Sequence, residues 1–262
     1  MVDNLYYIIF LFTIFACYGS FLNSFSYRLI NNKNLWTSRS YCPKCYKTIS
    51  FYDLIPIFSW IFLKAKCRAC KNSISILYPF IEILSAIVFT ALILFIDSRY
   101  WLSYFIVLTS LIIVIRTDFE TMLISTITTL LPIPIAFISS YFGFIPISLY
   151  ESIIGSLFGY FSLFLVAKIY TFITNQKKNI IGNGDFDLLA LIGAFMGFNG
   201  VILSIFLGSI LSTISFLIII LNDIKNIKNI REYKLPFGPW LSLGAILYLF
   251  FQNQIINFLY IN

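Results

Sequence analysis

Long apolar runs dominate the sequence and restrict what it can fold into. A helix needs about 20 mostly apolar residues to cross a bilayer. Hydrophobic residues make up 60% of the 262-residue chain and charged residues 11%, with a mean hydropathy of +0.90. A soluble domain of this size could not bury so much apolar surface. The sequence therefore predicts an all-α polytopic membrane protein with about eight transmembrane helices, at residues 5–25, 78–97, 100–117, 123–147, 151–173, 186–199, 200–221 and 240–260.

The sixth and seventh runs form one apolar stretch, Leu188 to Leu221, that is too long for one helix and short for two. Gly197-Phe-Asn-Gly200 offers a turn near its middle. Cytoplasmic loops attract Lys and Arg, and two helices here leave only Arg99 of the 18 basic residues outside. We therefore predict two helices, an outside N-terminus and a first helix that is retained rather than cleaved. The predicted cytoplasmic loops are 26–77, 116–122, 174–185 and 222–239.

Composition also excludes several classes of protein. The chain has no histidine, which excludes Ser-His-Asp triads, Cys-His dyads and His-ligated metal sites. The net charge of +7 is interpreted as loop charge beside a membrane rather than as a nucleic-acid-binding surface. A disordered chain and a secreted disulfide scaffold do not fit this composition either.

Residues 28–77 form one non-membrane insert, which holds half of the basic residues and four of the five cysteines. The cysteines lie in two pairs, Cys42-Pro-Lys-Cys45 and Cys67-Arg-Ala-Cys70. Each pair supplies two thiolates from one short turn, and four thiolates complete a tetrahedral zinc shell. We predict a closed, structural zinc site on the reducing cytoplasmic side, with unmetallated or redox-active thiols as the alternative. The cations of the insert are expected to contact anionic lipid headgroups.

The most informative acidic residues lie at the cytoplasmic helix ends. Asp118 ends the third predicted helix, and Asp185 opens the sixth in the sequence Gly182-Asn-Gly184-Asp185. Two carboxylates brought together can share one proton and act on water as general base and general acid. The two glycines allow the backbone to turn sharply and approach a bound chain. Taken alone, Asp185 could instead be a helix N-cap and Asp118 a helix-end partner of Arg116.

The ordered set of motifs resembles the type IV prepilin leader peptidases, which are membrane aspartic proteases of the GxGD kind. The resemblance covers nearly the whole chain. The matching stretches are Gly19-Ser-Phe-Leu-Asn23, Tyr27-Arg-Leu29, the two cysteine pairs, Pro56-Ile-Phe-Ser-Trp60, Tyr78-Pro-Phe-Ile-Glu82, Asp118-Phe-Glu-Thr-Met-Leu-Ile124, Gly182-Asn-Gly-Asp185, Leu188-Leu-Ala-Leu-Ile-Gly193 and Pro236-Phe-Gly-Pro239.

The resemblance implies an enzyme that cuts the short basic leader of prepilins or pseudopilins on the cytoplasmic side of the bacterial inner membrane. It implies Asp118 and Asp185 as the catalytic pair, with Gly182 and Gly184 shaping the site. Glu82 matches a family glutamate and is expected to support the site or to form a helix–helix hydrogen bond. Many members also methylate the new N-terminal residue with S-adenosylmethionine, and the same activity is expected here.

The same resemblance suggests three domains: a first helix (1–27), the zinc-binding insert (28–77) and a peptidase core of seven helices (78–262). Ser125 and Thr126 stand where the family usually has Pro and Asp or Asn, and Asp187 stands where it often has Lys. Two alternatives stay open, a GxGD protein with another substrate and a non-catalytic zinc-loop scaffold or transporter. Transport would favour charges near the bilayer midplane, whereas both aspartates are predicted at one membrane face.

Overall fold

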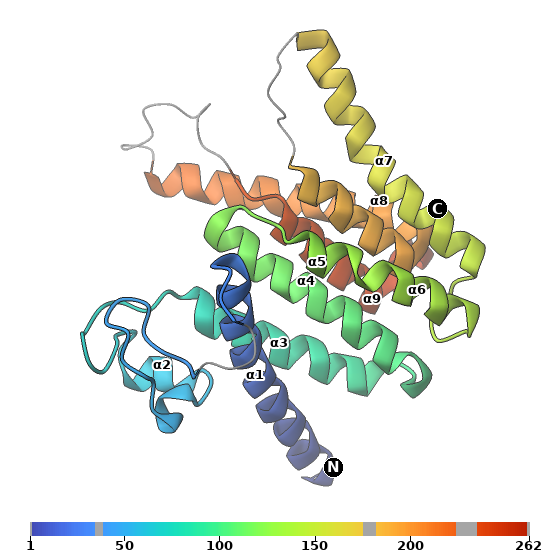
Figure 1. The fold of residues 1–262 in the computed structure, drawn as a ribbon. Helices are drawn as coiled ribbons and strands as arrows, with labels where there is room; N and C mark the ends of the chain where they lie inside the picture. The colour runs from blue at the N-terminus through green and yellow to red at the C-terminus, as the bar shows by residue number, and fades with distance from the viewer. Residues whose placement is uncertain (1, 35–38, 175–181, 224–234, 261–262) are drawn as a thin grey trace. The chain divides into compact units, whose positions relative to one another are not determined.

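The computed structural model describes residues 2–34, 39–174, 182–223 and 235–260, and divides the chain into two compact units. The first unit is Met1–Trp101 and the second is Leu102–Asn262. The elements of the first unit are α1 (Val2–Ile30), η1 (Phe51–Leu54), α2 (Phe58–Phe62), α3 (Leu77–Phe95) and η2 (Ser98–Tyr100). Those that follow are α4 (Trp101–Thr121), α5 (Thr126–Leu130), α6 (Pro132–Tyr141), α7 (Leu149–Thr174), α8 (Asn183–Asp223) and α9 (Gly238–Tyr260) (Figure 1).

The helices bear out the predicted membrane architecture. Within the described residues, five helical stretches are long and apolar enough to cross a membrane: Leu5–Ile30, Leu77–Phe95, Ser98–Thr121, Leu149–Thr174 and Asn183–Leu221. Thr126–Tyr141 and Gly238–Gln252 are apolar but shorter. The predicted run 123–147 is divided into α5 and α6, with Pro132 as the first residue of α6, a position where the missing N–H of proline is tolerated.

Helix α8 consists of two arms, as the sequence predicts. A straight helix of its 41 residues would be about 60 Å long, twice the hydrocarbon thickness of a bilayer. Gly197 interrupts it with φ 69° and ψ −169°, a backbone conformation that residues with a Cβ rarely adopt. Figure 1 shows the chain turning back at the right of the view, so that both ends of α8 lie toward the left.

Glycines bring each arm of α8 against a neighbouring helix. On the first arm, a Cβ at Gly193 would clash with the carbonyl oxygen of Gly155 on α7, and a Cβ at Gly155 would clash with that of Gly193. On the second arm, a Cβ at Gly244 of α9 would lie 2.7 Å from the carbonyl oxygen of Ser204. Small residues thus let these helix backbones touch, as expected for membrane helices.

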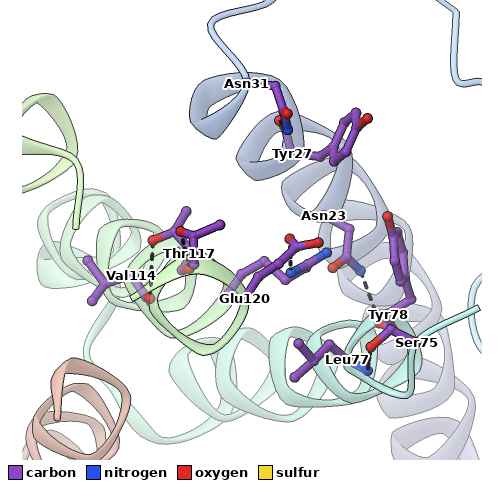
Figure 2. Close-up of polar contacts among 11 residues, drawn as sticks. Asn23, Tyr27, Asn31, Ser75, Leu77, Tyr78, Val114, Thr117 and Glu120 are labelled. Atoms are coloured by element: carbon purple, nitrogen blue, oxygen red, sulfur yellow. Dashed lines mark hydrogen bonds and ion pairs between the residues drawn. The ribbon is translucent and has the colours of Figure 1, made fainter. Parts of the chain in front are cut away.

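In the first unit, α1 and α3 pack along each other. The side-chain amide of Asn23 on α1 donates a hydrogen bond of 3.0 Å to the carbonyl oxygen of Tyr78 on α3 (Figure 2). At Gly19, a Cβ would lie 2.8 Å from the Cα of Glu82. Two of the motif stretches, near residues 19–23 and 78–82, are therefore in contact.

The orientation of the helices across the membrane stays a prediction, and so does the division into domains at residues 27 and 77. Several basic residues on which the orientation depends lie outside the described residues, namely Lys177, Lys178, Lys225, Lys228, Arg231 and Lys234.

Substituting Gly193 should weaken the contact between α7 and α8. Gly193→Ala inserts a methyl group against the backbone of Gly155, and such overpacking costs about 1–3 kcal/mol of stability. Thermal unfolding of the detergent-solubilised protein measures the loss. Gly182→Ala is the matched control, because its Cβ would make only an ordinary contact of 3.5 Å. Equal unfolding temperatures for the two variants would contradict this account of the seam.

Candidate active site and metal centre

The predicted catalytic residue Asp118 lies in the last turn of α4, and only 4% of its surface is exposed. The chain then turns at Met122, which has a φ of 55°. The N–H of Met122 donates to the carbonyl oxygen of Asp118 at 2.9 Å. This turn ends the helix and leads the chain to Ile124, which packs beside the site.

Asp185, the other predicted catalytic residue, lies half-buried in the first turn of α8. Its backbone N–H donates to the carbonyl oxygen of Gly182 at 3.1 Å and so closes the turn. A Cβ at Gly184 would lie 2.6 Å from the Cβ of Ile124, whereas one at Gly182 would meet only Oδ2 of Asp185 at 3.5 Å. Close packing therefore requires glycine at 184, while position 182 has room for a side chain.

A third helix end reaches the same place. The N–H of Gly238, at the start of α9, donates to Oδ2 of Asp118 at 3.1 Å. A Cβ at Gly238 would lie 2.8 Å from this oxygen and 2.8 Å from Cδ1 of Ile124. Ile124 is thus packed against both Gly184 and Gly238. In the sequence, Gly238 is recognisable only as part of the motif Pro236-Phe-Gly-Pro239, which predicts no role for it.

Asp118 and Asp185 come together around Ile124: its Cδ1 and Oδ2 of Asp118 both face position 238, and its Cβ faces Gly184, the residue before Asp185. Two carboxylates in such a place cannot both stay charged at little cost, so they are expected to share a proton and titrate as a unit. Such a pair can take a proton from water through one member and give a proton to a leaving group through the other. The arrangement is therefore suited to hydrolysis.

Arg116 pairs with a different acidic residue from the one that the sequence suggested. Arg116 does not pair with Asp118: its Nη1 lies 2.5 Å from Oε2 of Glu120, one turn further along α4. The side chain of Arg116 is fully buried and that of Glu120 is 37% exposed. Helix geometry explains the pairing, because residues four apart lie on the same face of a helix and residues two apart do not. Asp187 lies half-buried on α8.

Glu82 lies in the first unit, where it connects three segments. Its Oε2 accepts a hydrogen bond of 2.7 Å from the N–H of Ile57, and its carboxyl also bonds with the side chain of Ser20 on α1. Ile57 has a φ of 65°, which is unfavourable for a β-branched residue. Glu82 therefore forms the expected bond between helices and also holds the insert in a strained turn. Its part in any chemistry stays a prediction.

The four cysteines of the insert form one cluster. Their Sγ atoms all lie within 4.8 Å of one another, and those of Cys42 and Cys70 are 3.9 Å apart. A tetrahedral metal with bonds of about 2.3 Å to sulfur needs sulfur atoms about 3.8 Å apart. The donor set therefore fits a metal ion that prefers four thiolates. Cys17 lies apart from the cluster, exposed on α1.

Residues 40–49 and 65–74 fold into the same knuckle. In each, the N–H of the residue after the second cysteine donates to the carbonyl of the first cysteine, at 2.8 Å and 3.0 Å. These following residues, Tyr46 and Lys71, both have a left-handed φ, of 57° and 59°. The two segments share few side chains apart from the cysteines. The backbone nevertheless presents the two pairs of thiols in the same way.

The electrostatics of the knuckles favour a thiolate at Cys67. The N–H of Cys70 lowers the pKa of Cys67 to about 7. The N–H of Asn72 lowers the pKa of Cys70, but burial and the neighbouring thiols outweigh it and raise that pKa to about 11. Arg68, whose pKa is raised by Asp53, makes a bidentate ion pair with that carboxylate at 2.7 Å and 2.9 Å. This pair links the second knuckle to η1.

Known proteins resemble this chain over most of its length. Residues 14–96 match the bacterial peptidase A24 N-terminal domain, and residues 105–218 match the type IV leader peptidase family. Similar proteins named prepilin leader peptidase/N-methyltransferase include those of the following three bacteria. That of Pectobacterium carotovorum is 30% identical over 81% of this chain and 74% of its own. The protein of Neisseria gonorrhoeae is 32% identical over 81% of this chain and 71% of its own. The protein of Bacillus subtilis is 29% identical over 94% of this chain and 96% of its own. No solved structure matches the chain.

Removing the carboxylate of Glu120 should destabilise the protein. Glu120→Ala takes away the charged partner of the buried Arg116. We expect a loss of about 1–2 kcal/mol, the low end for a bond to a charged group, because water screens the exposed carboxylate. Glu120→Gln keeps an acceptor and should lose less. Chemical unfolding in detergent measures both, and a Glu120→Ala protein as stable as the wild type would contradict the prediction.

The cysteine cluster should bind one metal ion per chain. Cys42→Ser should release most of the metal and lower the unfolding temperature, because bound metal contributes folding free energy. Binding should weaken as the pH falls, since protons compete for the thiolates. Metal analysis and thermal unfolding measure both effects. The control is Cys17→Ser, which removes the cysteine on α1. Full metal content and stability in Cys42→Ser would refute the site.

Proposed function

We propose that this chain, which belongs to the type IV prepilin leader peptidase family, is a membrane aspartic endopeptidase acting on prepilins or pseudopilins. The observation that carries the proposal is the convergence of Asp118 and Asp185 from the ends of two different helices. The names of the relatives support the substrate class, a precursor with a short leader. The zinc-loop scaffold and the transporter do not account for the paired carboxyl groups as directly.

The proposed reaction is direct hydrolysis of one peptide bond. One carboxylate of the pair takes a proton from water while the water oxygen attacks the peptide carbonyl carbon. The protonated carboxyl then gives its proton to the leaving nitrogen, and the C–N bond breaks to leave a new carboxylate and a new amine. The mechanism uses no covalent intermediate, which agrees with a chain in which no histidine is present to activate a nucleophile.

We place the pair at the cytoplasmic face of the bacterial inner membrane. The support is the distribution of charge: all but one of the 18 basic residues fall in the loops, or at a helix end, on the same side as Asp118 and Asp185 when the eight helices alternate in direction. The N-terminus would then lie outside. A leader that carries its own positive charge would remain in the cytoplasm for the same reason.

The proposal also includes the identity of the metal and a second reaction. The metal held by the cysteines is taken to be zinc, which suits four sulfur ligands and would hold the two knuckles together without an open position for chemistry. The relatives' names support methylation of the new N-terminus, for which S-adenosylmethionine would supply the methyl group. The contacts described above assign no residue to that cosubstrate, and we derive no step through it.

Asp118→Asn and Asp185→Asn should each abolish cleavage, because each removes half of the acid–base exchange. The double variant should be scarcely slower than either single variant, since residues that act as a unit are not additive. Asp187→Asn should reduce the rate only modestly. Mass spectrometry of a peptide with a basic leader, Gly, Phe and an apolar run measures the cut and any methyl group.

The matched control for these variants is Asp97→Asn, an aspartate that caps η2 and accepts a bond from the N–H of Arg99. It should retain the full cleavage rate. If a folded Asp118→Asn protein kept more than about a tenth of the wild-type rate, a barrier change of under about 1.4 kcal/mol, the pair would be wrongly assigned.

A further inference from the structure

We propose that Gly238 is a positioning residue for Asp118: the amino end of α9 fixes one oxygen of this carboxylate and leaves the other for the attacking water. This inference rests on the proposed peptidase function. It adds a third helix end to a site that the family motifs describe by two aspartates, and it gives a physical reason for glycine at this position.

The hydrogen bond between Gly238 and Asp118 joins residues 120 positions apart in the sequence, and both are buried. Next to it, the ring of Phe119 on α4 meets the ring of Trp240 on α9 edge-on, with centroids 5.7 Å apart. Further along α9, Gly244 packs against the backbone of α8 at Ser204. The ring contact therefore holds the start of α9 against α4 beside the bond, while α9 packs against α8 further along.

The bond also acts on the charge of Asp118. This residue lies in the last turn of α4, where the free carbonyl groups of a helix disfavour a negative charge. The first N–H groups of α9 have the opposite polarity, and a backbone N–H that donates to a carboxylate favours its charged form. The amino end of α9 thereby offsets the unfavourable end of α4.

A side chain at position 238 would crowd two side-chain ends. A Cβ at position 238 would lie 2.8 Å from Oδ2 of Asp118 and 2.8 Å from Cδ1 of Ile124. The isoleucine has little space to withdraw, because its Cβ is also the atom that a side chain at Gly184 would strike. A methyl group at 238 must therefore displace the carboxylate or push α9 away, and either movement lengthens the hydrogen bond.

The decisive experiment is the cleavage kinetics of Gly238→Ala beside those of Gly244→Ala. Both variants add one methyl group to α9 at a close contact, with side-chain atoms at position 238 and with backbone atoms at position 244, and only the first one is near the carboxylate. We expect kcat of Gly238→Ala to fall about 100-fold, the effect of a misplacement of about 1 Å, with KM unchanged. Gly244→Ala should keep the wild-type kcat in the folded fraction, whatever its loss of stability.

A double variant separates the carboxylate from simple crowding. Ile124→Val removes the Cδ1 atom that the new methyl group would meet. If crowding against Ile124 caused the defect, Gly238→Ala/Ile124→Val would regain the wild-type kcat, and the inference would be overturned. If displacement of Asp118 is the cause, kcat stays low although stability recovers. The double variant also serves if Gly238→Ala alone folds poorly.

The outcomes distinguish this inference from the proposed function. A wild-type protein that cuts no leader peptide would overturn the function, and the inference with it. Active wild type, inactive Asp118→Asn and a Gly238→Ala variant with wild-type kcat would overturn the inference alone. An equal fall in kcat in Gly238→Ala and Gly244→Ala would also overturn it, because a general loosening of α9 would then explain the loss of activity.

Discussion

Contact between helix backbones at glycines is the constraint on which the packing of α7, α8 and α9 depends. In a bilayer, apolar side chains gain little by leaving the lipid, so helices associate through close packing of small residues. The first arm of α8 meets α7 at Gly155 and Gly193, and the second arm meets α9 at Ser204 and Gly244. The two arms are joined at Gly197, so α8 packs against a different neighbour on each arm.

The proposed catalytic residues lie at helix ends, because only there does a membrane helix have backbone groups that its own hydrogen bonds leave unpaired. Inside a helix every N–H and carbonyl is bonded to its own segment, and the first and last turns leave groups unpaired. The pair uses these groups directly: Met122 bonds back to Asp118, Asp185 bonds to Gly182, and Gly238 donates to the carboxylate. The site thus meets the needs of three helix termini while it orients the aspartates.

Much of the fold could be predicted from the sequence. Helix length and composition indicated the spans, and length together with charge indicated the two arms of α8, because a bilayer has a fixed thickness. Cysteine spacing indicated the cysteine cluster, because each CxxC turn supplies two thiols and two such turns complete a tetrahedral metal shell. The family resemblance, rather than periodicity, pointed to Asp118 and Asp185.

What the sequence could not show are contacts between distant residues and between backbones. The hydrogen bond between Gly238 and Asp118 joins residues 120 positions apart in the sequence, and no local sequence pattern predicts it. The twin knuckles are alike in backbone conformation rather than in side chains. Arg116 could have paired with Asp118 or Glu120 on charge alone, and helix geometry decided for Glu120.

Ser125 and Thr126 stand where the family usually has Pro and Asp or Asn, and the structure shows how the chain enters α5 without the proline. A proline would hold φ near −65°, and Ser125 takes a φ of −77° without one. The N–H and the hydroxyl of Thr128 both donate to the carbonyl of Ser125, at 3.0 Å and 2.7 Å, so side-chain bonding replaces the rigid ring. The chain therefore enters α5 in a proline-like conformation. Ile124, one residue earlier, lies between Gly184 and Gly238 beside the proposed catalytic pair.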